Sequence, residues 1–187
     1  MKLSFLLTIF FLSIFITTFS QHTNQEINLQ NQQPFLLGEI TVDGLSSNSY
    51  QSWYEQNFKN YEADQNKIDA FKDQLASYKV LLFMGTWCGD SKREVPRFIK
   101  VLESANFPMK NLKIVALDKR KESYKKSPQG EEWGLNIHRV PTFIFYKNGR
   151  EINRIIETPI TSLEDDLLKI VTQQEYIPNY TNSLHFD

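Results

Sequence analysis

The chain has 187 residues and a formal net charge of −1, with 41% hydrophobic and 23% charged residues. This length and composition are typical of a single globular domain with its own core. The near-neutral charge and the absence of a dominant basic block argue against a surface for nucleic acid or an anionic membrane.

The N-terminus has the pattern of a secretory signal peptide. A lysine at position 2 precedes the apolar run Leu3–Phe19, with small or polar residues near its end at Thr17, Thr18 and Ser20. We expect residues 1–20 to be cleaved, which predicts an extracytoplasmic (periplasmic or secreted) protein without stable membrane association. The alternative is an uncleaved membrane anchor, because the run is close to the lower limit of about 17 residues for a membrane-spanning helix.

The next segments predict a leader, a strand and a long helical region. Residues 21–34 are rich in Gln and Asn and predict a flexible leader. Residues 36–42 mix apolar and polar side chains before an Asp-Gly turn signal, which indicates a strand at a sheet edge. From Trp53 to Tyr78, aromatic and aliphatic residues recur at spacings of three, four and seven. This periodicity predicts core-facing helix in two pieces, with a break near residues 60–64.

The chain's only cysteine follows a buried strand. Residues 79–84 are mostly apolar and predict that strand, a turn containing Gly85 comes next, and a helix runs from Cys88 to about Ala105. At a helix start, unpaired backbone N–H groups and the helix dipole favour a thiolate, which is the nucleophilic form of cysteine. The other interpretation is a small buried apolar residue, which is common for a free cysteine.

The second half of the chain predicts three further strands and a last helix. Residues 112–117 form an apolar strand, 118–130 a charged and solvent-exposed segment, and 131–136 a short helix. The alternative for the charged segment is the steering of acidic substrates, because it follows the C-terminal end of a strand. Two strands, 142–147 and 151–156, flank Asn148-Gly149, a strong hairpin signal. Thr161 or Ser162 caps a helix that ends near Val171, and residues 176–187 form a polar tail.

These elements alternate in the order β-α-β-α-β-β-α, which predicts an α/β domain over residues 35–175. Two segments also resemble the thioredoxin family. The segment Trp87-Cys88-Gly89-Asp90-Ser91-Lys92, with Pro96 after it, resembles the active site, and Val140-Pro141-Thr142 resembles the cis-proline strand. The resemblance spans about residues 79–171. It implies a thioredoxin-like three-layer sandwich with a mixed central sheet flanked by helices and an N-terminal strand/helix extension.

The resemblance also implies roles for individual residues. It places Cys88 and Ser91 at the two catalytic positions, with Cys88 as the nucleophile, and it implies a cis peptide bond before the proline. Four residues are then expected to bind substrate: Trp87, Gly89, Val140 and Pro141.

The chain departs from the family pattern at three places. Ser91 replaces the second cysteine, Leu82 replaces the buried acid six residues before the nucleophile, and Glu157 replaces a glycine sixteen residues after the cis-proline. Without a second thiol, a mixed disulfide on Cys88 can be released only by an outside thiol. The Cys-Gly-x-Ser spelling also resembles monothiol glutaredoxins.

The charges around the cysteine are expected to be balanced. Asp90 lies beside the predicted thiolate and opposes it, and we expect His138 or Arg139 to offset the Asp90 charge. Three histidines far apart in sequence and one cysteine lack metal-ligand spacing, so no metal or other cofactor is expected.

We therefore expect an exported, thioredoxin-like thiol–disulfide exchange protein that acts through a single cysteine. Its expected partners are protein thiols and disulfides or glutathione-like thiols, and not nucleic acid. The alternative is a non-catalytic thioredoxin-fold module that binds peptides or proteins.

Overall fold

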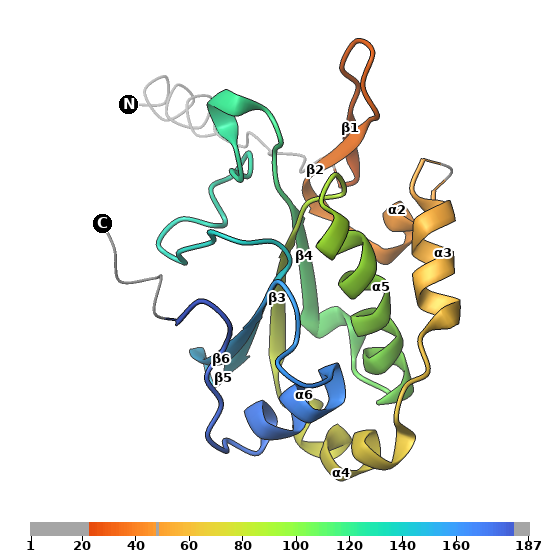
Figure 1. Cartoon of the computed structure of the whole chain (residues 1–187). Coiled ribbons are helices and arrows are strands. Elements are labelled where there is room, and N and C mark those ends of the chain that lie inside the picture. Colours follow the sequence, from red (N-terminus) through yellow and green to blue (C-terminus); the bar gives the residue numbers. More distant parts are fainter. Residues whose placement is uncertain (1–22, 48, 182–187) are drawn as a thin grey trace, which may run out of the picture.

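The computed structural model describes residues 23–47 and 49–181, so the predicted signal peptide lies outside the described residues. It contains one six-stranded sheet in the order β1-β2-β4-β3-β5-β6 (Figure 1). The strands are β1 (Gln25–Ile27), β2 (Phe35–Ile40), β3 (Lys79–Met84), β4 (Leu112–Ala116), β5 (Thr142–Lys147) and β6 (Arg150–Ile156). The helices are α2 (Val42–Leu45), α3 (Gln51–Asn60), α4 (Gln65–Leu75), α5 (Gly89–Ser104) and α6 (Leu163–Val171). Two short 3₁₀ turns lie at Met109–Asn111 and Lys121–Ser123. The predicted α/β fold, with a mixed sheet flanked by helices, is confirmed.

The pairing of the central strands positions the site. β3 and β4 are parallel, whereas β3 and β5 are antiparallel, with Phe83 opposite Thr142. The end of β3 therefore lies beside the beginning of β5. Residues that follow β3 and residues that precede β5 meet at this edge of the sheet.

Local sequence signals explain several element boundaries. The predicted break in the long helical region is confirmed, because α3 ends at Asn60 and α4 begins after Asp64, whose side chain accepts a hydrogen bond from the Lys67 N–H at 3.2 Å. The predicted hairpin is also confirmed. Asn148 and Gly149 have φ values of 53° and 77°, the two positive values that a type I′ turn requires.

The two faces of the sheet are covered differently. A large core cluster lies between one face and the helices, with residues from all of α2 to α6. A smaller cluster on the other face centres on Phe83, Val115 and Ile144 and contains no residue of these helices. Its cover is the connection between β4 and β5, drawn in teal in Figure 1, which contributes Leu135 and Ile137. In the predicted three-layer sandwich, a loop and not a helix thus forms the layer on this face of the sheet.

The segment at 21–34 and the strand after it differ from the prediction. The supposed leader contains β1, which pairs with β2, so β2 lies between β1 and β4 and not at the sheet edge. Asn24 extends this pairing, since its side chain accepts a hydrogen bond from the Thr41 N–H at 2.8 Å. A polar strand is stable here because its backbone groups pair with a neighbour.

Two predictions in the C-terminal half also need correction. Residues 131–136 form turns and no helix, because Gly134 and Asn136 adopt positive φ values of 73° and 54°. The tail predicted from residue 176 packs on the domain as far as residue 181. Tyr176 is only 8% exposed, and its hydroxyl donates to Asp166 at 2.8 Å.

The described helices are all too short or too polar to cross a lipid bilayer.

The contact between Tyr176 and Asp166 predicts a measurable stability effect. Asp166 is fully buried and also accepts the N–H groups of Ile160 and Thr161 at 2.7 and 3.3 Å. Burial, together with the Asp166 charge, raises the pKa of Tyr176 well above its ordinary value, so the hydroxyl remains a donor. Tyr176→Phe should lower the free energy of unfolding in urea by about 1–2 kcal/mol.

The matched control is Tyr124→Phe, which removes a hydroxyl from a ring that is 51% exposed. Its free energy of unfolding should stay within about 0.5 kcal/mol of the parent's. Equal effects of the two substitutions would contradict the docking of the tail on α6.

Candidate functional site

Cys88 lies at the N-cap position of α5, directly after the turn that follows β3. Its sulfur is half-buried and donates a hydrogen bond to the Val140 carbonyl at 3.2 Å. Gly89 is exposed, and a Cβ added there would meet no atom within 4 Å. The thiol therefore lies at an open surface, between the start of a helix and the segment before β5. The interpretation of Cys88 as a fully buried apolar residue is wrong.

The turn before Cys88 is held by several contacts. The Cys88 N–H donates to the Gly85 carbonyl at 2.9 Å, and Ser91 Oγ accepts from the Gly85 N–H at 3.2 Å. The Trp87 indole N–H donates to the Leu117 carbonyl at 2.9 Å. Its ring packs so closely over Gly85 that an added Cβ would lie 2.6 Å from it, so a glycine is required. Ser91 is fully buried and helps to shape this turn.

The segment before β5 forms the facing wall of the site. The peptide bond between Val140 and Pro141 is cis. The Pro141 carbonyl accepts the Glu157 N–H at 2.7 Å, and Thr142 Oγ1 donates to the Arg139 carbonyl at 2.7 Å. These bonds fix the segment against β6. The structure thus brings the Val140 carbonyl to the Cys88 thiol, and Pro141 follows Val140 in the chain.

The expected partners of Asp90 are not the ones that the structure shows. Asp90 forms an ion pair with Arg93 at 2.7 Å, three residues along the same helix, because these positions are neighbours on a helix surface. Arg139 instead pairs with Glu157 at 3.5 Å, and its guanidinium lies 4.7 Å from the centre of the Tyr180 ring. His138 is exposed and contributes its carbonyl oxygen to a hydrogen bond with Lys125. Neither His138 nor Arg139 therefore forms an ion pair with Asp90 in the described structure.

Lys125 is a functional candidate that the sequence did not reveal. Its ammonium lies near Cys88, Arg139 and Glu157 and interacts electrostatically with all three. Burial, and next the Arg139 charge, lower the pKa of Lys125, while Cys88 and Glu157 act in the opposite direction. In sequence Lys125 is one of several lysines in a charged run. Only its φ of 58° and its place in the loop distinguish it from the others.

Asp118 positions Lys125. It follows β4, is 1% exposed, and its carbonyl accepts the Lys125 N–H at 2.9 Å while its N–H donates to the Lys126 carbonyl at 3.0 Å. Its carboxylate accepts the Arg120 N–H at 2.8 Å and pairs with the Arg120 guanidinium at 2.6 Å. The loop that follows β4 therefore closes on itself, and the Lys125 ammonium at its end donates to the His138 carbonyl.

Glu157 and the end of the described tail form a polar cluster beside Pro141. Glu157 has a φ of 65°, and its carboxylate accepts the hydroxyl of Tyr180 and pairs with Arg139. The replacement of a family glycine by Glu157 was visible in the sequence. The contact between Glu157 and Tyr180 was not visible in the sequence, because the two residues lie 23 positions apart.

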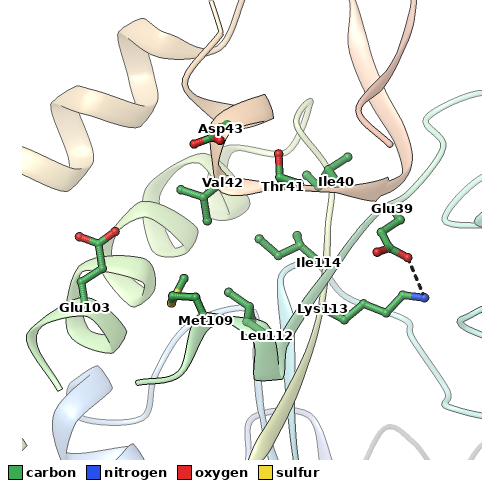
Figure 2. A pocket seen from close by; sticks show the side chains of 10 residues that line it. All are labelled: Glu39, Ile40, Thr41, Val42, Asp43, Glu103, Met109, Leu112, Lys113 and Ile114. Atoms are coloured by element: carbon green, nitrogen blue, oxygen red, sulfur yellow. Dashed lines mark ion pairs between the residues drawn. The ribbon is translucent and has the colours of Figure 1, made fainter. Parts of the chain in front are cut away.

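Figure 2 shows another hollow of the molecule, with a volume of about 390 Å³. It lies between β2, β4 and the end of α5, and Glu39 and Lys113 form an ion pair of 3.1 Å across its rim. Neither Cys88 nor Pro141 lines it, so it is separate from the thiol. No group of three or more potential metal-ligating side chains occurs within residues 23–47 and 49–181.

The site can therefore present one thiol, which contacts a peptide carbonyl and lies within electrostatic range of a lysine ammonium, to a partner at the surface. Leu82 is fully buried and apolar, so it supplies no proton-accepting group below the thiol. Ser91 supplies no second sulfur.

The position of Lys125 predicts an effect on thiol reactivity. Lys125→Gln removes the positive charge that faces the attacking sulfur, so the alkylation of Cys88 by iodoacetamide at pH 7 should slow by about threefold to tenfold. Lys125→Arg keeps the charge and should stay closer to the parent. The rate is measured by intact-mass spectrometry over time.

Lys126→Gln is the matched control, since Lys126 is the exposed neighbour in the same loop. Its alkylation rate should match that of the parent. If Lys125→Gln and Lys126→Gln behave alike, the Lys125 ammonium has no influence on the sulfur.

Known thioredoxins are similar to this chain. The chain is 28% identical over 106 residues to a thioredoxin of Chlamydia trachomatis, with 56% of this chain and 91% of that protein covered. It is 31% identical over 96 residues to a putative thioredoxin-5 of Dictyostelium discoideum, with 51% and 84% covered. The solved structure of Fasciola hepatica thioredoxin matches at 17% identity and a TM-score of 0.35, covering 57% of this chain and 89% of that one. A family model described as thioredoxin matches residues 43–167, more than half of the chain, which therefore belongs to the thioredoxin family.

Proposed function

We propose that this protein is an exported thiol–disulfide exchange protein that acts through the single thiol of Cys88. The observation that carries the proposal is the setting of the sulfur. It is half-exposed at the start of α5, 3.2 Å from the Val140 carbonyl, and it interacts with the Lys125 ammonium. Membership of the thioredoxin family makes exchange the chemistry to expect of such a thiol.

The first step is the formation of a mixed disulfide. The thiolate of Cys88 attacks one sulfur of a substrate disulfide, the substrate S–S bond breaks, and a new S–S bond joins Cys88 to the substrate. The departing sulfur leaves as a thiolate, which takes up a proton from water. The proton that Cys88 lost goes to solvent, so charge and electrons balance.

The second step needs a thiol from outside the domain. Ser91 lies where a resolving cysteine would be and cannot attack the mixed disulfide. An external thiolate, or another thiol of the same substrate, attacks the substrate sulfur and displaces the Cys88 thiolate. The first route leaves the substrate joined to the external thiol by a disulfide, and the second rearranges disulfides within the substrate. Cys88 ends each cycle in its starting form.

The partners we propose are polypeptides with thiols or disulfides, together with glutathione-like thiols for release. Within the described part of the chain, the Val140 N–H has no hydrogen-bond partner, although the Val140 carbonyl accepts the Cys88 thiol. An extended peptide beside the site could accept a hydrogen bond from this group. The unpaired Val140 N–H is therefore an observation in favour of a polypeptide substrate.

A second candidate function is a binding module without catalysis. The observations that favour it are the loss of the second cysteine at Ser91 and the apolar Leu82. The polar cluster of Glu157, Arg139 and Tyr180 beside Pro141 also favours it, because it alters the surface that a substrate would meet. The reactivity of the thiol separates the two functions.

The proposal predicts a one-thiol reaction. With glutathione disulfide, the folded protein should gain the mass of one glutathione on Cys88, and the adduct should persist until a free thiol is added. Ser91→Cys places a second thiol at i+3 on the same helix, and it should release the adduct without added thiol. Both reactions are measured by intact-mass spectrometry.

Two controls make the test specific. Cys88→Ser should gain no mass, and Ser91→Ala should keep the adduct like the parent, which shows that a thiol and not a packing change causes release. A parent thiol that stays unmodified in the folded protein would refute the exchange function and favour the binding module.

The proposed export rests on the N-terminal pattern alone, and residues 1–20 lie outside the described residues. We expect the mature protein, isolated from the extracytoplasmic fraction, to begin near Gln21. Its intact mass should lack the first 20 residues. A mass that retains them would show an uncleaved anchor, as the alternative predicts.

A further inference from the structure

We propose that a hollow beside Trp87 binds an acidic side chain of the polypeptide whose disulfide reacts at Cys88. This inference rests on the proposed exchange function and adds the class of substrate. The hollow has a volume of about 370 Å³, in the range of sites for small ligand groups. The argument uses six of the residues that line it: Pro34, Tyr50, Trp53, Trp87, Lys92 and Lys119.

The walls come from separate parts of the chain. Pro34 precedes β2, Tyr50 and Trp53 lie at the start of α3, and Trp87 belongs to the turn before Cys88. The rings of Tyr50 and Trp53 meet edge to face, with centroids 6.3 Å apart. The hollow is thus formed where the N-terminal extension meets the active-site turn.

The aromatic walls are held in place by their polar groups. The Tyr50 hydroxyl donates to Glu26 at 2.8 Å, and the Trp87 indole N–H donates to the Leu117 carbonyl at 2.9 Å. Burial, and next the hydrogen bond to Glu26, raise the pKa of Tyr50 above its ordinary value, so this hydroxyl remains a donor. Glu26 is occupied by Tyr50 and does not line the hollow.

The charged side chains that line the hollow are both cations. Two lysines line it and no aspartate or glutamate does. Within residues 23–47 and 49–181, neither Lys92 nor Lys119 forms an ion pair. Lys119 uses one donor, to the Gln33 carbonyl at 2.9 Å, and an ammonium has three. A carboxylate would therefore find two cations that the protein leaves without anionic partners.

The ligand must also be linked to the reacting sulfur. Trp87 is the neighbour of Cys88 in sequence, and the Lys92 N–H donates to the Cys88 carbonyl at 3.0 Å in the first turn of α5. One helical turn spans about 5.4 Å, so a peptide of a few residues is long enough to extend from Cys88 to the hollow. A polypeptide joined to Cys88 can place an acidic side chain there. The positive end of the α3 dipole, near Tyr50 and Trp53, adds to the attraction.

The test uses two synthetic peptides that differ only in charge. Each contains one cysteine as a mixed disulfide with thionitrobenzoate, and the flanking positions carry Glu in one peptide and Gln in the other. Attack by Cys88 releases thionitrobenzoate, which is followed by its absorbance. The Glu peptide should react several-fold faster at low salt, and 0.5 M NaCl should remove most of this advantage.

The rate ratio of the two peptides is the decisive quantity, because it cancels any change in the thiol itself. In Lys92→Gln/Lys119→Gln the ratio should fall to about one. The matched control is Lys79→Gln/Lys110→Gln, which has the same net charge and changes two exposed lysines outside the hollow. This control should keep the parent ratio.

A second measurement locates the binding without any reaction. The chain has three tryptophans. Trp53 and Trp87 line the hollow, whereas Trp133 does not and is 78% exposed. Titration with the Glu peptide in which serine replaces cysteine should shift the indole ¹⁵N–¹H signals of Trp53 and Trp87, and not that of Trp133.

The outcomes separate this inference from the exchange function. Equal rates for the two peptides, or unchanged signals of Trp53 and Trp87, would overturn the acidic-substrate hollow and leave exchange intact. If neither peptide releases thionitrobenzoate, the exchange function fails. The titration then still decides whether the hollow takes an acidic peptide.

Discussion

The antiparallel pairing of β3 with β5 is the constraint on which the site depends. It places Phe83, near the end of β3, opposite Thr142, the first residue of β5. Cys88 follows Phe83 by a few residues, and Val140 precedes Thr142. The register of the two strands therefore brings the Cys88 sulfur to 3.2 Å from the Val140 carbonyl oxygen. A slip of one residue would turn the strand's side chains to the opposite face and separate the thiol from the cis-proline segment.

The second wall of the site is a loop, and its order comes from Asp118. A helix in this place would satisfy its own backbone groups, whereas a loop needs other partners. Asp118 provides them through backbone bonds to Lys125 and Lys126 and through its carboxylate to Arg120. The electrostatic environment of Cys88 therefore depends on a residue that never contacts the sulfur in the described structure.

Parts of the chain outside the family match border the site. The family model covers residues 43–167, yet Pro34 lines the hollow beside Trp87 and Tyr180 meets Arg139 beside Pro141. The thiol and the cis-proline belong to the part shared with the family. The surfaces on either side of them are completed by residues outside the matched range.

The sequence by itself determined what depends on neighbouring residues. The Asn148-Gly149 turn, the helix break before Asp64 and the strand-turn-helix around Cys88 all follow from local rules, because turn, cap and periodicity signals act within a few positions. Only the tertiary structure decided what joins distant segments. It paired β1 with β2, docked Tyr176 on Asp166, and placed Lys125 by the thiol in preference to His138 or Arg139. These contacts arise from strand pairing and burial over long sequence separations, and no local pattern in the chain records them.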